Sequence, residues 1–338
     1  MKGQKIKFIK RASLFIFLLL LILSIYASFV AYFSETPTLT SWTHQMFQTK
    51  DRIALEKGSP KLIMFGGSNV LFGVSAKEAE NKLNIPTMNY ASHADVGDYV
   101  FEKIKRASKP GDVIVMALEY EYYWYDRKFV FEKQSTKERY ILSHDRDYYD
   151  SLSPGEKLNI LLVGIEDLSI NVRARLGNLS GYYPLTLNEW GDINNESFEF
   201  GENVTFRPKI IAFPDDFERN FYKADGVKAL TELSRWSRQN NITIIASFPA
   251  TVYFEEYDSP DYLKSFQRIE LFYRELNITA IGTPYDFFYD IDNFYDTQYH
   301  LNSEYKLNRT RFLASKLREL GIPGLPKFQE QKNKHSNE

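Results

Sequence analysis

The chain contains no cysteine, and only five of its 338 residues are histidine. Without cysteine it can form no disulfide framework, so an exported domain of this sequence must depend on its buried core. The sequence also contains no His-Glu-x-x-His pair, no cysteine ligand set and no Walker loop. We therefore expect neither a metal nor a nucleotide cofactor.

The chain also lacks an excess of either charge, since its formal net charge is -2. This near balance gives no support to nucleic-acid binding. Its residues are 43% hydrophobic and 25% charged, as is typical of a globular protein with one large domain or two smaller ones. Aromatic residues make up 16% of the chain. They suit a sugar-facing or membrane-adjacent surface, and an aromatic core explains them as well.

A nearly unbroken apolar run extends from Ala12 to Phe33 and follows a basic cluster. As a helix rising about 1.5 Å per residue, it is long enough to cross a hydrocarbon core of roughly 30 Å. The basic flank should remain in the cytoplasm, which places everything after Ser34 in the periplasm or at the cell surface. A cleaved signal peptide is the alternative, but Tyr26–Phe33 shows no good small-x-small exit site. We therefore favour residues 1–34 as an uncleaved, single-pass anchor in the cytoplasmic (inner) membrane.

An α/β pattern occupies residues 61–322, after a juxtamembrane linker with a short helix at residues 35–60. The predicted strands are Lys61–Phe65, Pro86–Tyr90, Asp112–Leu118, Ile242–Phe248 and Ile278–Ile281. Helical patterns are found at Ser75–Leu83, Asp98–Ala107, Asp225–Gln239, Asp261–Leu276 and Ser303–Leu320. This alternation predicts a doubly wound parallel sheet with helices on both faces, a three-layer arrangement of flavodoxin-like type. The functional site of such a sheet lies beyond the carboxyl ends of its strands.

Residues from about 122 to 207 interrupt the α/β alternation and are rich in Tyr, Asn, Asp and Glu. We interpret them as an insertion over the strand ends, partly helical around Ser153–Ile170. The insertion is either a lid or substrate-binding element, or a variable surface elaboration. The polar tail at residues 323–338 is expected to be disordered.

Two separated segments carry the residues of a serine-based site. The apolar run from Ile63 ends in Gly66-Gly67-Ser68-Asn69, which indicates a buried strand followed by a tight turn with an exposed hydroxyl. A serine hydroxyl is a poor nucleophile until an imidazole removes its proton and a carboxylate orients that imidazole.

His300 and Asp296 precede the last predicted helix and are the candidate base and orienting carboxylate, with Asp292 in reserve. Ser68 is the candidate nucleophile. The structural alternatives are a helix cap or turn for Asp296 and a core histidine for His300.

On these residues the chain resembles the SGNH/GDSL hydrolase superfamily. It is most similar to the membrane-anchored, extracytoplasmic branch that includes the D-alanine-transfer protein of teichoic acid synthesis and the alginate O-acetylation proteins. The resemblance covers roughly residues 61–120 and 240–320 and leaves the insertion unmatched. It implies the SGNH fold, acyl chemistry on a cell-surface polymer and no cofactor. The family's Asp and His are separated by two residues, whereas Asp296 and His300 are separated by three.

The resemblance also implies where an acyl oxyanion is bound. The backbone amide of Ser68, in the first of the family's sequence blocks, is one expected donor. The second block falls in Asn89–Gly97, and its glycine position falls on Ala94. Asn69 and His93 are further candidates for oxyanion or substrate contact. The third block follows Ile114–Leu118 at Glu119-Tyr120-Glu121. Its asparagine position falls on Glu119, which cannot donate a hydrogen bond when ionised. Because losing one such donor costs on the order of 10²–10³ in rate, the sequence favours a transferase or a very selective esterase.

Two rival chemistries find little support. The Gly66-Gly67-Ser68 turn resembles a phosphate cradle, but no second glycine block or lysine follows it. Glu119 and Glu121 are separated by one residue, so on a strand both would lie on one face, as the two carboxylates of a glycosidase could. No second acidic constellation accompanies them.

The sequence thus predicts a membrane-anchored serine esterase or acyltransferase that acts on acyl groups of a cell-surface polysaccharide. The expected partners are that polymer or a lipid-linked acyl acceptor, and a membrane acyltransferase. The alternative is a catalytically degenerate SGNH scaffold that binds polymer or docks to such an acyltransferase. The missing third-block asparagine and the irregular Asp–His spacing favour this alternative.

Overall fold

The computed structural model of the chain describes residues 2–34, 37–124, 136–166, 168–177, 186–193 and 207–321. It divides into two compact units. The first comprises Met1–Gln45 and Lys133–Pro184, and the second comprises Met46–Glu132 and Leu185–Glu338. The predicted disordered tail lies outside the described residues.

The second unit contains a five-stranded parallel sheet with the strand order β2-β1-β3-β4-β6. The strands are β1 (Leu62–Gly66), β2 (Thr87–Asn89), β3 (Val113–Ala117), β4 (Thr243–Ala246) and β6 (Thr279–Ala280). β1 and β3 are buried throughout, as expected for apolar strands that helices cover on both faces. The predicted α/β fold with a parallel sheet is therefore confirmed.

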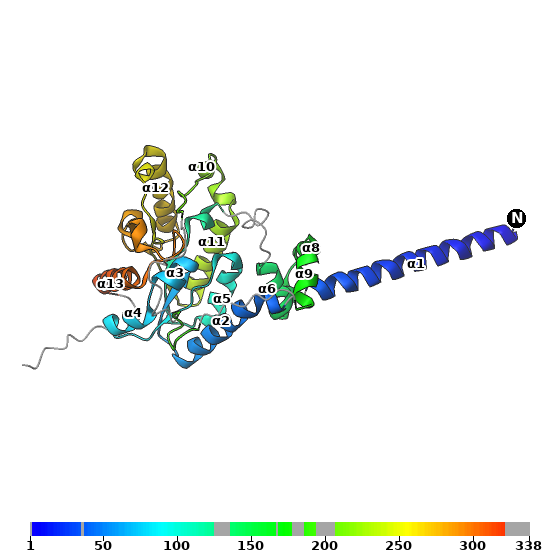
Figure 1. Cartoon of the computed structure of the whole chain (residues 1–338), viewed down its shortest axis with the longest axis horizontal. Coiled ribbons are helices and arrows are strands. Elements are labelled where there is room, and N and C mark those ends of the chain that lie inside the picture. Colours follow the sequence, from blue (N-terminus) through cyan, green and yellow to red (C-terminus); the bar gives the residue numbers. More distant parts are fainter. Residues whose placement is uncertain are drawn as a thin grey trace, which may run out of the picture. The chain divides into compact units, whose positions relative to one another are not determined.

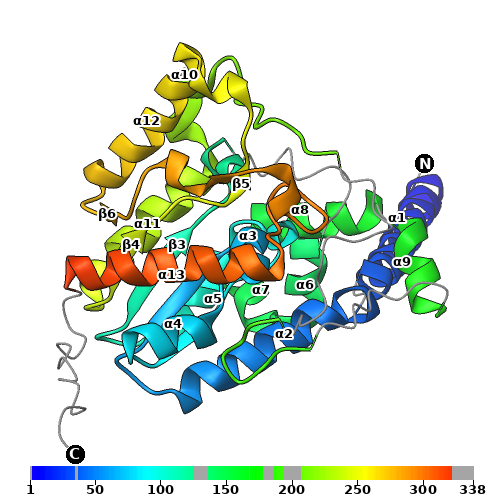
Figure 2. The same ribbon diagram turned by 60° about the vertical axis from the view of Figure 1, so that its left-hand side comes forward.

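Helices lie on both faces of the sheet. α3 (Ser68–Gly73) and α4 (Ala76–Leu83) contact α13 (Ser303–Leu320), which crosses in front of the strands in Figure 2. α5 (Tyr99–Ala107) and α11 (Asp225–Gln239) contact each other instead. This division follows from right-handed crossovers, because the chain leaves β1 toward β2 and then returns past β1 to β3. The order reverses between β1 and β3, so this switch point is where a ligand site is expected.

The other described elements of the second unit are mostly short helices, apart from the longer α12. They are η1 (Ala94–Val96), η2 (Tyr120–Tyr123), α10 (Phe217–Asn220), η4 (Phe221–Lys223), η5 (Glu255–Asp258), α12 (Pro260–Glu275), η6 (Pro284–Phe287) and η7 (Ile291–Asn293). A second, two-stranded sheet pairs β5 (Thr251–Val252) with β7 (Phe288–Tyr289).

The predicted linker at residues 35–60 is instead largely a helix, α2 (Pro37–Glu56), and the boundary between the two units falls within it. Beyond that boundary, Met46, Phe47, Ile53 and Ala54 are buried in the core of the second unit. Lys50, which is also buried, lies three or four residues from each of these four, and this spacing is that of one face of an amphipathic helix. The core therefore begins before Lys61, because α2 supplies an apolar stripe that its polar residues obscure in the sequence.

The first unit contains α1 (Lys2–Ser34) and four helices of the predicted insertion. These are α6 (Thr136–His144), α7 (Arg146–Ser151), α8 (Pro154–Glu166) and α9 (Leu168–Arg175). α8 and α9 contact α1 (Figure 1). The insertion is helical where the sequence predicts it, but these helices group with the N-terminal helix rather than with the sheet.

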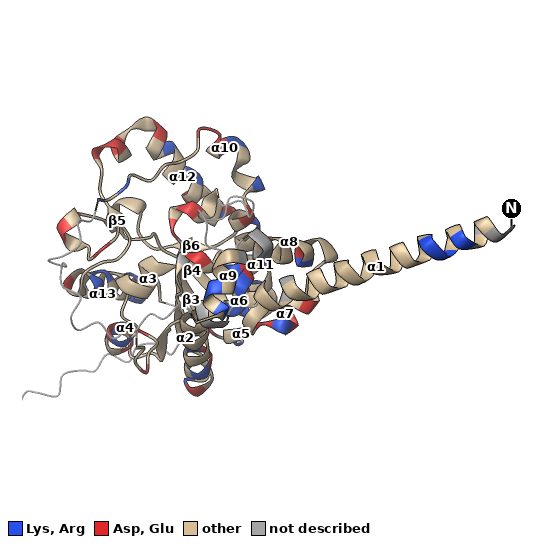
Figure 3. Ribbon diagram, turned by 45° about the vertical axis from the view of Figure 1, so that its right-hand side comes forward, with Lys and Arg blue, Asp and Glu red and all other residues tan. Residues whose placement is uncertain are grey.

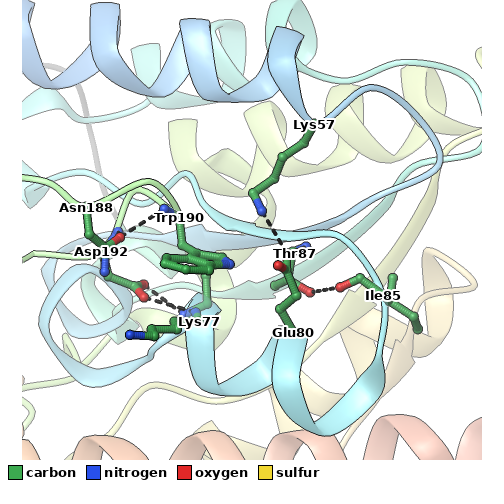
Figure 4. A network of polar contacts seen from close by, with 9 residues as sticks. Lys57, Lys77, Glu80, Ile85, Thr87, Asn188, Trp190 and Asp192 are labelled. Atoms are coloured by element: carbon green, nitrogen blue, oxygen red, sulfur yellow. Dashed lines mark hydrogen bonds and ion pairs between the residues drawn. The ribbon is translucent and has the colours of Figure 1, made fainter.

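Residues 186–193 of the insertion belong to the second unit and pack against α4 and β2. The carboxylate of Asp192 accepts hydrogen bonds from the backbone amides of Ala76 (2.8 Å) and Lys77 (3.1 Å) at the start of α4. The Trp190 ring lies 5.5 Å from the ammonium of Lys57 and 5.3 Å from that of Lys77. Figure 4 shows Trp190 and Asp192 beside Lys77. This short segment therefore covers the amino end of a helix.

α1 contains a candidate membrane span at Ile6–Phe29, with a mean hydropathy of 2.5 and none of it buried. Its lysines and Arg11 lie toward the N-terminal end, and the helix after Arg11 carries no charge (Figure 3). Such a helix is consistent with a signal anchor or a signal peptide.

Candidate active site

The turn after β1 requires glycine because β3 lies too close for any side chain. A Cβ at Gly66 would lie 2.2 Å from the carbonyl oxygen of Ala117, and a Cβ at Gly67 would lie 2.1 Å from a carboxylate oxygen of Glu119. Neither glycine has a positive φ. The Gly-Gly pair thus permits close approach between the ends of two strands rather than a left-handed backbone.

Ser68 is the first residue of α3 and is half-buried, whereas the next residue, Asn69, is fully buried. The amide nitrogen of the Asn69 side chain donates to the carbonyl oxygen of Ala117 at 3.0 Å. The side chain of Asn69 therefore faces the core, which contradicts the prediction that it contacts substrate.

His300 and Asp296 are joined by a 2.7 Å contact between Nδ1 of the imidazole and Oδ1 of the carboxylate. The backbone amide of Tyr295 donates to the carbonyl of His300 at 2.8 Å, so the intervening loop is closed at its base. This closure lets a carboxylate four positions before the histidine reach its imidazole. Asp292, the reserve candidate, contributes only a backbone carbonyl, which accepts a hydrogen bond from Asn302.

The imidazole of His300 also stacks on the ring of Phe72, with ring centroids 4.1 Å apart and an interplanar angle of 28°. Phe72 lies four residues after Ser68 on α3, and side chains four residues apart share one face of a helix. The stack therefore places the imidazole over the face of α3 that Phe72 shares with Ser68. Because Nδ1 contacts Asp296, the other ring nitrogen, Nε2, is the one left for a serine hydroxyl.

The second block runs alongside the end of β1. The backbone amide of Ser92 donates to the carbonyl of Gly66 at 3.1 Å, and Ala94 begins η1 two residues later. Nδ1 of His93 lies 3.7 Å from a carboxylate oxygen of Asp95, and both side chains are partly exposed. Ala94 and His93 thus lie in the segment that follows β2, which the Ser92–Gly66 hydrogen bond joins to the start of the Ser68 turn.

The third block holds the Ser68 turn in place. Oε1 of Glu119 accepts a hydrogen bond from the backbone amide of Asn69 at 2.9 Å, and the side chain is only 2% exposed. Oε2 is buried with no hydrogen-bond partner among the described residues. Glu119 therefore lies beneath the turn as an acceptor, which differs from the predicted contact with substrate or oxyanion.

Two residues later, Glu121 contacts the loop that carries His300. The Tyr299 hydroxyl donates to both carboxylate oxygens of Glu121, at 2.8 and 3.1 Å. Burial raises the pKa of Glu121 to about 7, although the Tyr299 hydrogen bond opposes this rise. Repulsion from Glu119 raises this pKa further. Glu119 and Glu121 thus connect the third block to the two segments that carry Ser68 and His300.

Sequence reasoning missed Arg309, a fully buried residue on α13. Its guanidinium donates to the carbonyl of Asn69 at 2.8 Å, to the side chain of Asn69 at 3.0 Å and to the carbonyl of Phe248 at 3.0 Å. Burial lowers the pKa of Arg309 to about 10. The available signal was its position on the buried stripe of α13, between Lys306 and Leu313.

Lys50 was also missed. It is fully buried on α2 and donates to the carbonyl of Ala91 in the second block at 2.6 Å. Burial lowers the pKa of Lys50 to about 7, which attraction from Asp192 opposes and repulsion from Lys306 reinforces. In the sequence, Lys50 could have been recognised by its place on the apolar stripe of α2, three residues before Ile53.

Described residues include no group of three or more His, Cys, Asp or Glu side chains that could hold a metal ion. The sheet order and the switch point define a doubly wound α/β protein, and the turn after β1 and the loop before α13 carry a Ser–His–Asp candidate site.

No protein-family model matches the chain, and no curated relative matches it. Among solved structures, the protein YxiM of Bacillus subtilis is similar, with a TM-score of 0.38 and 12% sequence identity over 79% of this chain. The chain spans only 58% of the length of that protein. A likeness of this size carries no argument about residues or chemistry.

Proposed function

We propose that the chain is a membrane-anchored serine esterase or acyltransferase that acts on acyl groups of a cell-surface polysaccharide. The observation that carries this proposal is the Asp296–His300 contact of 2.7 Å, with the imidazole stacked on Phe72, four residues after Ser68. This arrangement supplies a nucleophile, a base and an orienting carboxylate from two segments far apart in the sequence.

In the proposed reaction, Ser68 Oγ attacks the acyl carbonyl while His300 Nε2 takes the hydroxyl proton. Asp296 holds the imidazole through Nδ1 and stabilises the imidazolium that forms. The backbone amides of Ser68 and Ala94 bind the oxyanion. The protonated His300 then donates to the departing alcohol, and an acyl-serine remains. A water molecule or a sugar hydroxyl, deprotonated by His300, completes hydrolysis or transfer.

The position of Glu119 supports transfer or a selective esterase over general hydrolysis. Its buried carboxylate accepts from Asn69 and does not supply the third oxyanion donor that the resemblance implies. Because one missing donor costs on the order of 10²–10³ in rate, a simple ester substrate should react slowly. A polymer substrate can offset this loss through binding energy away from the reacting carbonyl.

The proposed location is extracytoplasmic, with the N-terminus in the cytoplasm and α1 as a retained anchor. α1 has the required length and apolarity, and its basic residues precede the span. A lipid-linked polymer or an acyl-exporting membrane partner could then reach the site, at a local concentration raised by tethering. A topology reporter fused after Glu338 tests this arrangement; a cytoplasmic signal would overturn both the compartment and the substrate class.

An activated-serine probe tests the nucleophile directly. The purified full-length chain in detergent micelles should be labelled at Ser68, as located by peptide mass spectrometry, and the Ser68→Ala variant should not be labelled. Ser92→Ala is the matched control, since Ser92 is a buried serine in the neighbouring block. His300→Gln should reduce the labelling rate by about 10³-fold or more, because serine loses its base. Labelling that persists in Ser68→Ala but disappears in Ser92→Ala would overturn the assignment.

The Glu119 contact also favours a second candidate, a degenerate scaffold that binds polymer or docks to a membrane acyltransferase. A site held together without its third donor could keep its fold after losing its chemistry. A Ser68→Ala/His300→Ala double variant separates the two. If the folded double variant sustains the cellular modification of the polymer at wild-type level, the scaffold function is correct; if the modification is lost, the catalytic function is supported.

A further inference from the structure

An apolar surface on α8 has no role in the proposed acyl chemistry. Leu158 and Leu162 are 56% and 45% exposed and lie four residues apart, so they share one face of the helix. On the same helix Ile160 is buried. A helix that packs on protein normally presents polar residues outward. Here apolar side chains occupy both the inward and part of the outward surface of α8.

The helix that carries this surface packs on the apolar N-terminal helix. Both α8 and α9 contact α1 within the first unit (Figure 1). The guanidinium of Arg175, at the end of α9, lies over the ring of Tyr32 at 4.1 Å. Tyr32 follows the candidate span Ile6–Phe29 by one turn of helix. The packing therefore sets α9 at the level where the α1 span ends.

The charges near this level suit a lipid headgroup layer. Arg173 and Arg175 lie in the last turn of α9, and Arg173 is exposed. Tyrosine at the end of a span and arginine near the lipid phosphates are the usual residues of a membrane interface. Leu176, the residue after α9, is 69% exposed. Apolar and basic side chains thus occur together next to the end of a span, as they do in helices that lie in the membrane interface.

We propose that α8 is a second membrane contact: its Leu158–Leu162 face lies in the acyl-chain boundary of the leaflet at which α1 emerges. The occupant of this surface is lipid, because α8 contacts the apolar helix α1 and the neighbouring α9 ends in basic residues. The proposal rests on the anchored topology but not on the serine chemistry. It also gives α1 a structural role after export, since cleavage of α1 would uncover the α8 and α9 surfaces that pack on it.

The absence of cysteine permits a direct depth measurement on the full-length chain. Single variants Leu158→Cys and Leu162→Cys would carry a nitroxide spin label in nanodiscs of phosphatidylglycerol and phosphatidylcholine. Collision with oxygen, which concentrates in lipid, is compared with collision with a water-soluble nickel chelate. Phe15→Cys in the middle of α1 is the lipid reference. Leu271→Cys on α12 is the matched aqueous reference, because Leu271 and Leu162 are both 45% exposed.

Labels at positions 158 and 162 should give oxygen-to-nickel collision ratios close to that of Phe15→Cys and several-fold above that of Leu271→Cys. Nickel-dominated collision at both positions, with Phe15→Cys still oxygen-dominated, would overturn the α8 contact and leave the anchor intact. Nickel-dominated collision at Phe15→Cys would overturn the anchor and the α8 contact together. Protection from both reagents at 158 and 162 would identify a protein as the occupant, which also overturns the lipid contact.

Discussion

The amino ends of β1 and β3 are joined by a buried ion pair, whereas their carboxyl ends meet at a buried carboxylate with an unpaired oxygen. At the amino end, the ammonium of Lys61 lies 2.6 Å from Asp112, and neither side chain is exposed. Asp112 also accepts hydrogen bonds from the hydroxyl of Ser59 and from the backbone amides of Lys61 and Lys109. Both carboxylate oxygens are therefore paired.

At the carboxyl end the hydrogen bonding is incomplete. Oε2 of Glu119 and the hydroxyls of Ser92 and Ser247 are buried without partners among the described residues. These residues follow β3, β2 and β4, so they lie along the same edge of the sheet as the Ser68 turn. Unpaired buried polar groups cost folding free energy, and proteins retain them mainly where function requires them.

The two ends of this sheet thus differ in what their polar groups do. The amino end uses polar groups to stabilise the fold. The carboxyl end gives up hydrogen bonds at the switch point, where the candidate site lies. Variants at the two ends should therefore differ in whether they change stability, activity or both.

The largest effect on stability is expected from Lys61→Met. Removing one partner of a buried ion pair leaves an uncompensated charge, which typically costs about 3–5 kcal/mol. The free energy of unfolding, measured by chemical denaturation in detergent micelles, should fall by that amount. The labelling rate of Ser68 in the remaining folded protein should not change.

Arg52→Met is the matched control for Lys61→Met. Arg52 and Glu56 form an ion pair at 2.7 Å, but their side chains are 62% and 59% exposed. Such a surface pair is worth about 0–1 kcal/mol. If Lys61→Met lowers the free energy of unfolding no more than Arg52→Met does, the buried ion pair at the amino end does not stabilise the fold.

A smaller loss of stability with a large loss of activity is expected from Gly67→Ala. The added Cβ would lie 2.1 to 2.5 Å from three atoms of the Glu119 carboxyl group, so the turn must shift. Overpacking of this kind costs about 1–3 kcal/mol. A shift of the turn also displaces Ser68, and the probe-labelling rate should drop by at least about tenfold, because small misplacements of reacting groups are costly.

The Glu119→Ala background tests the cause of this effect. With the carboxylate removed, Gly67→Ala should lower the free energy of unfolding less than it does in the wild type. The double-mutant cycle should then show a coupling of about 0.5–3 kcal/mol. Gly155→Ala is the control, since a Cβ at Gly155 has no heavy atom within 4 Å. Additive effects of Gly67→Ala and Glu119→Ala would contradict the proposed clash.

The fold was largely predictable because its strands are local patterns. The apolar runs of β1 and β3 are buried throughout, so their composition alone indicates a parallel sheet. The helix that starts after Ser75 was predictable too, because its hydroxyl accepts from the amide of Glu78 as an N-cap does. The stripe of α2 was missed because charged and polar residues interrupt it.

The candidate site was predictable only in part. Ser68, His300 and Asp296 lie in segments with recognisable residue patterns, and the Asp296–His300 contact is local in the chain. The contacts of Glu119, Glu121 and Arg309 are not local: the Tyr299–Glu121 hydrogen bond joins residues 178 positions apart. No spacing rule in a single sequence indicates such a pair, because it depends on how the strands are ordered.

The smallest predicted effect concerns the pH dependence of Glu121 at the carboxyl end. Burial raises the pKa of this carboxyl from 4.5 to about 7, so the folded chain binds a proton that the unfolded chain releases. Stability from this group is fully present below pH 4.5, falls between pH 4.5 and about 7, and is level above that. The difference in unfolding free energy between the wild type and Glu121→Gln should therefore decline over this window. Its size should be on the order of 1–2 kcal/mol, given the partial exposure of the side chain.

Tyr299→Phe sharpens this last prediction. The Tyr299 hydroxyl lowers the pKa of Glu121 by donating to the ionised form, so its removal should move the end of the decline to higher pH. Chemical denaturation of wild type, Glu121→Gln and Tyr299→Phe across pH 4 to 9 measures both effects. If the difference in unfolding free energy between the wild type and Glu121→Gln rises with pH, Glu121 is stabilised as a carboxylate. The carboxyl end would then pair its charges as the amino end does, and the contrast between the two ends of the sheet would fail.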